Sequence, residues 1–165
     1  MRLVIQRVSE ASLTANGTDR GQMKQGMVVL IGIEEADTEE DTSWLANKLV
    51  SMRIFSDSEG KMNLSLADIA GSLMIVSHFT LHASTKKGNR PSFIKAARPE
   101  TAIPLYENFI EQCENLLLSS PNLKANSQQL IANSQLITGL FGADMQIQLI
   151  NDGPVTIIID SKERE

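Results

Sequence analysis

The sequence predicts a mixed α/β domain in which a curled or barrel-like β-sheet packs with two main helices. Three observations predict this fold class: many short apolar or β-branched runs end at turn residues, only two segments show helical spacing, and the chain has no internal repeat. With 165 residues, 42% of them hydrophobic and 21% charged, the chain has the composition of one globular domain over residues 1–165.

The first third of the chain predicts two strands and one helix. Residues 2–15 are rich in Val, Ile and Leu and run into the Asn-Gly pair at 16–17, a dipeptide typical of tight hairpin turns. The continuous apolar run at 27–33 predicts a buried strand. Thr and acidic residues at 38–41 supply a cap and negative charge for a helix, whose apolar positions recur with helical spacing as far as Met52.

The middle of the chain predicts further strands and a second helix. Residues 53–55 predict a short strand, and the β-branched and aromatic run at 72–81 predicts a central strand. The Gly and Pro residues within 88–91 indicate a loop. An amphipathic helix is expected over 101–118, where Pro104 is tolerated because we place it in the first turn.

A polar segment separates this helix from the last strands. Residues 119–135 are rich in Ser, Asn and Gln, so we expect an exposed excursion. Two strands then close the chain over 145–150 and 155–160, and the turn sequence Asn-Asp-Gly-Pro at 151–154 separates them.

The composition excludes several classes of protein. One cysteine, Cys113, and two histidines leave no intrachain disulfide and make a structural metal site unexpected. Cys113 has helical spacing with apolar neighbours, which predicts a core position. No apolar run approaches the roughly 18 residues that span a membrane, and charged residues interrupt the N-terminal segment, so we expect a cytoplasmic protein. The Gly-containing stretch at 139–142 is too short for a phosphate-binding loop, and we expect no cofactor.

The basic residues are unevenly distributed. The chain has a net charge of −5, yet residues 69–99 contain no Asp or Glu. The basic residues of this segment are Lys86, Lys87, Arg90, Lys95 and Arg98. Such a basic segment on an acidic protein attracts a phosphate-bearing ligand to one place. The alternative is an ordinary solvated basic loop.

Polar residues at the end of the run at 72–81 are candidates for chemistry. Ser77 or Thr80 beside His78 suggests a nucleophile and its base. In an extended strand, however, Ser77 and His78 point to opposite faces, while His78 and Thr80 lie about 7 Å apart. No acidic residue is placed to orient the imidazole, which disfavours a catalytic triad. A metal pair of His78 and His82 is disfavoured too, because four residues of strand separate them by about 13 Å.

The Gly153-Pro154 pair is a second candidate. Proline cannot donate to a sheet ladder, so the pair marks the start or the edge of the last strand. It is either an ordinary turn or a rigid stretch of backbone, almost without side chain, that forms the wall of a ligand site.

Six segments of the sequence occur in the order found in one known family. They are MRLVIQRVSEAS at 1–12, GKMNLSL at 60–66, SHFTL at 77–81, KKGNRPSF at 86–93, FGADM at 141–145 and NDGPVTIIIDS at 151–161. On these segments the sequence resembles the D-aminoacyl-tRNA deacylase family (the D-tyrosyl-tRNA deacylase type). The resemblance implies the fold of that family, a homodimer, and an enzyme that hydrolyses the ester between a D-amino acid and the 3′ end of a tRNA. We expect no membrane or DNA partner.

The resemblance also implies roles for individual residues. The catalytic site would be lined by four consecutive residues: Ser77, His78, Phe79 and Thr80. The substrate-binding residues would be Arg7, Phe93, Phe141, Met145, Gly153 and Pro154. In this set a Gly-cis-Pro pair would reach in from the partner subunit and exclude L-amino acids, and the two Phe and the Met would border the terminal adenosine. Arg7 would fix the Gly-Pro loop. The tRNA phosphates would be bound by three basic residues: Lys86, Lys87 and Arg90.

The sequence departs from the family pattern at two places. The family usually has Gln where this chain has His78, and imidazole titrates near neutral pH whereas an amide does not. The polar segment at 119–135 is longer than is typical of the family.

The expected mechanism uses the substrate as well as the protein. An aminoacyl ester is already activated, so positioning and oxyanion stabilisation supply much of the rate. The backbone N–H groups of Phe79 and Thr80 would hold the oxyanion, and the resemblance implies that the 2′-hydroxyl of the terminal adenosine helps to activate water. Glycyl-tRNA should be hydrolysed as well. Two alternatives stay open: a Thr80-dependent esterase, and a non-catalytic module that binds RNA ends and in which His78 marks lost activity.

Overall fold

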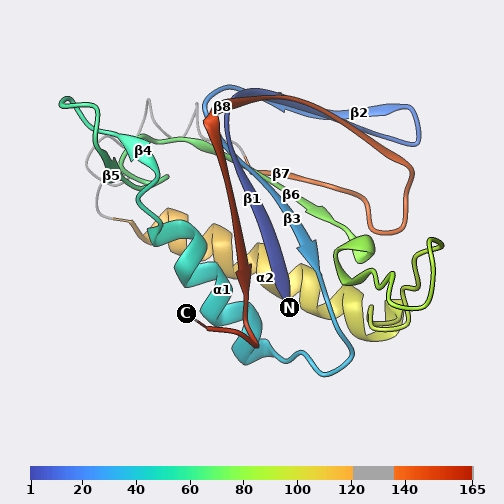
Figure 1. Cartoon of the computed structure of the whole chain (residues 1–165). Coiled ribbons are helices and arrows are strands. Elements are labelled where there is room, and N and C mark those ends of the chain that lie inside the picture. Colours follow the sequence, from blue (N-terminus) through green and yellow to red (C-terminus); the bar gives the residue numbers. More distant parts are fainter. Residues whose placement is uncertain (121–135, 165) are drawn as a thin grey trace.

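A computed structural model of the chain describes residues 1–120 and 136–164 (Figure 1). The strands are β1 (Arg2–Ala15), β2 (Thr18–Met23), β3 (Gly26–Gly32), β4 (Phe55–Ser56), β5 (Met62–Leu64), β6 (Ser72–Ser77), β7 (Leu136–Thr138) and β8 (Met145–Asp160). The helices are α1 (Glu39–Ser51), the short 3₁₀ helix η1 (Phe79–His82) and α2 (Pro99–Ser119). The mixed α/β class and the two main helices that the sequence predicts are therefore confirmed.

The main sheet curls until its two sides nearly meet. Its strand order is β2-β1-β3-β6-β7, and β8 pairs with β1. The long strand β1 pairs with β3 along its first half and with β2 along its second half, so one strand bends between two neighbours. At the opening, Arg20 on β2 donates a hydrogen bond of 3.5 Å to the Thr138 carbonyl on β7, and Gly21 lies against the side chain of Ile137. The sheet is thus barrel-like, as predicted.

Both main helices cover the same side of the sheet (Figure 1). They are linked to each other by the Thr42 hydroxyl of α1 and Asn108 of α2, which share a hydrogen bond. Phe109 and Cys113 of α2 are fully buried against the strands, so the core position expected for Cys113 is confirmed. Within the two described ranges, no helix is long and apolar enough to cross a membrane.

The central strands bury both of their faces, which explains their uninterrupted apolar sequence. In β6, Leu73 and Ile75 point into the core between sheet and helices, while Met74 and Val76 point into a second core inside the curled sheet. Strand β3 alternates in the same way and pairs with β6 in parallel. The buried strands predicted at 27–33 and near 72 therefore form the centre of the fold.

The strand predicted over 72–81 is shorter than expected. Strand β6 ends at Ser77, and the next backbone N–H, that of His78, donates to the Ile31 carbonyl at 2.8 Å. Strand β3 ends at Gly32, so the chain has no ladder partner beyond this point and turns into η1. The distances derived for an extended strand between His78 and Thr80, and between His78 and His82, are therefore wrong.

Other boundaries also differ from the predictions. Helix α2 begins at Pro99 rather than 101, which places Pro104 in the second turn instead of the first. The two strands predicted over 145–150 and 155–160 form one strand, β8, and the short strand predicted at 53–55 is Phe55–Ser56. Strands β2, β5 and β7 were not predicted, because each is short or polar. Of the excursion expected at 119–135, residues 121–135 lie outside the described part of the chain.

Candidate active site

A cavity of about 300 Å³ opens beside the end of β6. Its walls come from the ends of β3 and β6, from η1, from the start of α2 and from the segment that leads into β8. The described residues that line it are Ile31, Ile33, Val76, Ser77, His78, Phe79, Thr80, Ala97, Ala102, Phe141, Gly142, Ala143, Met145 and Ile147. Residues predicted for the site from two distant motifs, SHFT and FGADM, therefore face one cavity.

The turn η1 is held against the end of β3 by close packing and by two polar contacts. A side chain at Gly32 would put its Cβ 2.9 Å from Cβ of Leu81 and 3.0 Å from the ring of His82, so only glycine lets the turn lie this close. The His82 imidazole is buried, with Nδ1 3.0 Å from a carboxylate oxygen of Glu34. Arg2 donates a hydrogen bond of 2.9 Å to the Leu81 carbonyl. These contacts position the turn that forms the cavity wall.

His78 is the one ionisable side chain among the described residues that line the cavity. It is half-buried, and burial lowers the pKa of its imidazole below the ordinary value of 6.5, with no charged neighbour contributing. Within the described part of the chain, its ring makes no hydrogen bond. Burial therefore favours the neutral form of the imidazole, and its ring nitrogens are not engaged by protein groups that the structure describes.

The cavity wall also offers hydrogen-bonding groups that carry no charge. The hydroxyls of Ser77 and Thr80 belong to residues that line it. The backbone N–H groups of Phe79 and Thr80 are the first two of η1 and have no acceptor within the described residues. Two adjacent amide donors beside a cavity suit an oxygen atom that gains negative charge.

The opposite wall depends on a buried tyrosine. Tyr106 of α2 donates from its hydroxyl toward two carbonyls, that of Ile75 at 2.9 Å and that of Gly139 at 3.3 Å. Its ring also lies 6.1 Å from the ring of Phe141, centre to centre. Burial raises the pKa of Tyr106 to about 12. Tyr106 therefore ties α2 and β6 to the start of the segment that carries Phe141 and Met145.

An aromatic pair forms the rim of the cavity. Phe79 is 59% exposed, and the ring of Phe93 meets it edge-on with centres 5.1 Å apart. Phe93 is not among the lining residues, so the structure places it at the rim rather than inside the cavity. Phe141 and Met145 do line the cavity.

The predicted tRNA-binding residues lie on an exposed loop next to this rim. Ser84 and Ser92 exchange backbone hydrogen bonds of 2.8 and 2.9 Å, which closes the loop between them. Lys86, Lys87 and Arg90 are all exposed on it, and no carboxylate among the described residues pairs with them. Their positive charge is therefore available to an external anion.

The Gly153-Pro154 pair lies away from the cavity of its own chain. Its peptide bond is cis, and both residues are exposed. Arg7 holds this turn: its Nε lies 3.1 Å from the Asp152 carbonyl, and its Nη1 donates to the Ile54 carbonyl at 2.6 Å. Gly153 has φ of +127°, and a Cβ there would lie 2.9 Å from Nη2 of Arg7, so only glycine fits. The structure thus joins Arg7 to the Gly-Pro turn but joins neither to the cavity.

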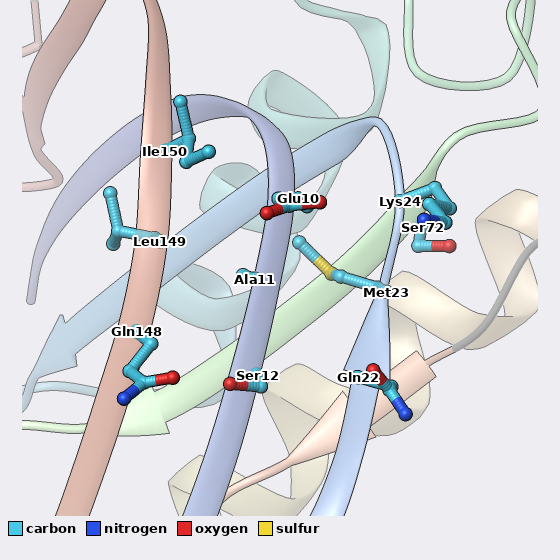
Figure 2. Close-up of a pocket in the computed structure, with 10 residues that line it drawn as sticks. All are labelled: Glu10, Ala11, Ser12, Gln22, Met23, Lys24, Ser72, Gln148, Leu149 and Ile150. Carbon is cyan, nitrogen blue, oxygen red and sulfur yellow. The ribbon is translucent and has the colours of Figure 1, made fainter.

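A second, larger depression of about 570 Å³ lies where β1, β2 and β8 run side by side (Figure 2). In register, Ser12 of β1 is paired with Gln22 on one side and with Gln148 on the other. Leu149 and Ile150 of β8 also border it. None of the residues predicted for the site lies here, so we assign the chemistry to the smaller cavity.

Sequence reasoning missed the apolar part of the site and its supports. Ile31, Ala97 and Ala102 line the cavity, yet an apolar strand end or an alanine carries no signal that it faces a ligand. His82 and Tyr106 were missed as supports because their partners lie 48 and 31 or more residues away, respectively. Only a departure of these polar residue types from an otherwise apolar pattern could have drawn attention to them.

Comparison with known proteins agrees with the fold and the motif segments. A model of the family described as D-Tyr-tRNA(Tyr) deacylase matches residues 4–160. Over 165 residues, 100% of both chains, the sequence is 57% identical to the D-aminoacyl-tRNA deacylase of Akkermansia muciniphila. Over the same full length it is 51% identical to the D-aminoacyl-tRNA deacylase of Flavobacterium johnsoniae.

Solved structures show the same fold. One, described as c-Myc DNA Unwinding Element Binding Protein, superposes with a TM-score of 0.79 at 35% identity and covers 97% of this chain and 98% of that one. Another, a probable eukaryotic D-amino acid tRNA deacylase, superposes with a TM-score of 0.73 at 18% identity over 96% and 97% of the two chains, which shows the fold alone. The fold and the sequence together define a hydrolase of the tRNA deacylase class. The chain belongs to the D-Tyr-tRNA(Tyr) deacylase family, and the predicted family resemblance is confirmed.

Proposed function

We propose that this protein hydrolyses the ester bond of D-aminoacyl-tRNA and releases a free D-amino acid and tRNA. The observation that carries the proposal is the cavity in which the SHFT and FGADM segments meet, in a chain of this family. Its volume of about 300 Å³ suits a small ligand group such as the end of a nucleic acid strand. We further propose that Phe141 and Met145 border the terminal adenosine, with Phe93 at the rim.

The catalytic groups that we propose are mostly groups of the backbone and of the substrate. The amides of Phe79 and Thr80 would donate to the carbonyl oxygen of the ester as it gains charge. The 2′-hydroxyl of the terminal adenosine would hydrogen-bond and help to activate the attacking water. The described lining holds no carboxylate, lysine or cysteine, so the hydroxyls of Ser77 and Thr80 are the side chains there that could act as a protein nucleophile.

A homodimer is needed to bring the Gly-Pro pair to the cavity. Met145 lines the cavity and Gly153 lies eight residues along the same strand, which corresponds to about 26 Å. The pair therefore cannot reach the cavity of its own chain. Among the described strands, β8 pairs only with β1, so its other edge is free. Leu149 lies midway between Met145 and Gly153, so two copies of β8 running antiparallel about this residue would set the Gly-Pro turn of each opposite the cavity of the other.

The surface around Leu149 supports this arrangement. Ile150 is 55% exposed and Leu149 is half-buried, although both are apolar. Both border the depression of Figure 2, which a second copy would cover. Burial of exposed apolar side chains is the usual driving force of a stable homodimer.

Selection between D- and L-amino acids would follow from steric exclusion. If the amides hold the carbonyl group, an L side chain points at the Gly153-Pro154 backbone of the second copy and collides with it. A D side chain points outward and is not recognised, so many D-amino acids are accepted. Glycine has no side chain to exclude, so glycyl-tRNA would be hydrolysed too. Lys86, Lys87 and Arg90 would bind tRNA phosphates, in the cytoplasm where charged tRNA is used.

A deacylation assay tests the proposed function. Purified protein is mixed with D-tyrosyl-tRNA, L-tyrosyl-tRNA or glycyl-tRNA, and the remaining ester is followed over time. We expect rapid loss of the D ester, slower loss of the glycyl ester and no loss of the L ester above the uncatalysed rate. Equal rates for D- and L-tyrosyl-tRNA would refute steric selection, and binding of the RNA end without hydrolysis would favour the non-catalytic module.

The Thr80 hydroxyl lines the cavity, so an acyl-enzyme mechanism is tested separately. Thr80→Val removes the hydroxyl and keeps the backbone amide. We expect near-normal turnover from this variant, and a strongly reduced rate for a substrate whose terminal ribose lacks the 2′-hydroxyl. Loss of turnover in Thr80→Val, together with cleavage of small aryl esters by the unsubstituted protein, would favour the esterase.

A further inference from the structure

Two aromatic side chains, Phe79 and Phe93, are exposed at the rim of the cavity, and no step of the proposed chemistry uses either ring. Phe79 is 59% exposed and Phe93 is 36% exposed, and their ring centres lie 5.1 Å apart in an edge-to-face pair. Ile94, the next residue along the chain, is 93% exposed. Large apolar side chains that gather at the surface beside a cavity are typical of an area that a ligand covers.

The backbone that carries each ring is fixed. Phe79 is the first residue of η1, which packs against the end of β3. The Phe93 carbonyl accepts a hydrogen bond of 3.0 Å from the Ala96 amide, and the next amide, that of Ala97, donates at 2.8 Å to the Ile33 carbonyl just beyond β3. Because both segments are anchored without a ligand, little conformational entropy is lost when a ligand covers the rings.

The ring pair lies between the cavity and the basic loop. Phe79 lines the cavity, and Phe93 directly follows Ser92, whose backbone hydrogen bonds with Ser84 close the loop. The three basic residues of the 86–90 loop are exposed and pair with no carboxylate that the structure describes. An RNA strand that leaves the cavity across this rim therefore meets an aromatic surface and then positive charge. Aromatic rings beside a row of cations are the combination that binds single-stranded nucleic acid.

The cavity of about 300 Å³ suits one end group, so the nucleotide before the terminal adenosine lies outside it. In an edge-to-face pair each ring keeps at least one face that the other ring does not cover, and a base stacks on such a face whatever its sequence. We propose that the rings of Phe79 and Phe93 form a stacking platform for the base of the nucleotide that precedes the terminal adenosine. This inference rests on the proposed function and adds the second nucleotide of the RNA end to the substrate that the site recognises.

The test removes the base and the rings in turn. D-Tyrosyl-tRNA is prepared with the second nucleotide from its 3′ end either intact or abasic, and kcat/KM for deacylation is measured with each substrate. With the unsubstituted protein we expect the abasic substrate to be hydrolysed about tenfold less efficiently. Phe79→Leu and Phe93→Leu each remove an aromatic face and keep the backbone amide, so in both variants the difference between the two substrates should fall below about threefold. Because the two substrates are compared on the same protein, a general loss of activity in a variant does not affect this difference.

Phe79→Tyr and Leu118→Ala are the controls. Tyrosine keeps the aromatic face, so Phe79→Tyr should keep the tenfold difference between the substrates. Leu118 is 57% exposed and lies about 24 Å along α2 from Ala102 of the cavity lining, at 1.5 Å per residue. Leu118→Ala removes an exposed apolar side chain away from the rim, so it should keep the tenfold difference as well.

Analytical ultracentrifugation of the variants tests whether the rings instead contact a second copy of the chain. We expect both Leu variants to keep the oligomeric state of the unsubstituted protein, and a loss of self-association would overturn the inference by assigning the rings to an interface. A tenfold difference that persists in either Leu variant would overturn it too. Equal hydrolysis of the intact and abasic substrates by the unsubstituted protein would overturn it while leaving the proposed function intact. Failure of the unsubstituted protein to hydrolyse intact D-tyrosyl-tRNA would instead refute the proposed function and this inference with it.

Discussion

Tyr106→Phe removes one hydroxyl that ties helix α2 to the cavity wall. The Ile75 carbonyl keeps a partner in this variant, because the Gly139 N–H donates to it at 2.8 Å. The Gly139 carbonyl loses the Tyr106 hydroxyl, its hydrogen-bond partner within the described residues. The variant loses one net hydrogen bond and leaves one buried carbonyl without its partner, which together lower the free energy of unfolding by about 2 kcal/mol. For a chain of this size that loss lowers Tm by roughly 4 to 8 °C.

The loss of stability caused by Tyr106→Phe should depend on pH, because the Tyr106 hydroxyl titrates. Burial raises the pKa of Tyr106 to about 12, whereas a tyrosine in the unfolded chain has a pKa of about 10. The unfolded state therefore loses its proton first, and the stability that Tyr106 contributes is complete below pH 10 and is lost as the pH rises toward 12. The difference in stability between Tyr106 and Phe should shrink over that range. Cys113, whose pKa burial also raises to about 12, is present in both proteins and does not affect the difference.

Urea unfolding and steady-state kinetics test this reasoning together. Because the Gly139 carbonyl begins the segment that carries Phe141 and Met145, we expect KM for D-tyrosyl-tRNA to rise several-fold in Tyr106→Phe. Thr42→Val is the control, since it also deletes a buried hydroxyl but lies between α1 and α2, away from the cavity. It should lower stability without changing KM. A stability loss below about 0.5 kcal/mol in Tyr106→Phe, or an equal KM change in both variants, would refute the role of Tyr106.

Three further predictions concern the basic loop, a buried carboxylate and the packing of η1. Replacing the three basic residues of the 86–90 loop by Gln should weaken tRNA binding and lower the slope of log affinity against log salt by about 2; an unchanged slope would exclude the loop as the contact. Burial acts to raise the pKa of Asp41, but hydrogen bonds from Lys162, from Ser161 and from the Thr38 amide outweigh it and hold the pKa well below its usual range. Its stabilising effect is therefore complete above about pH 4 and is lost progressively as the pH falls toward the lowered pKa of the folded state. Asp41→Asn should lower the free energy of unfolding at pH 7 and by about 1 kcal/mol less at pH 3, measured by urea unfolding; a loss that is independent of pH would contradict this. Gly32→Ala should lower the free energy of unfolding by about 1–3 kcal/mol and reduce turnover, because the added Cβ displaces η1. In a double-mutant cycle, His82→Ala should relieve part of this destabilisation. Strictly additive effects would show that residues 32 and 82 do not touch.

Local sequence patterns predicted the elements whose burial repeats along the chain. Strands β3 and β6 have apolar runs, and helices α1 and α2 have apolar residues at helical spacing, because these are the faces that each element buries in the core. The predicted boundaries of these elements agree with the observed ones to within a few residues. Strands β2, β5 and β7 lack such a pattern and were missed. The extended geometry assumed for 72–81 failed at Ser77 because the partner strand ends there, and the length of a neighbouring strand is not encoded in the segment itself.

For the site, too, some features could be predicted from the sequence and others only from the tertiary structure. The identity of the SHFT, FGADM and Gly-Pro segments, their order, and the basic stretch between them were available from the amino-acid sequence, because residue type and spacing are local properties. The resemblance to the family implied that Ser77–Thr80 and Phe141 share one site and that Arg7 fixes the Gly-Pro turn, although no local pattern shows these contacts. Tertiary packing alone decided that Tyr106 and His82 support the cavity walls, and that the Gly-Pro turn lies away from the cavity of its own chain. Which distant residues meet depends on how the whole sheet curls and where each strand ends, and no single segment carries that information.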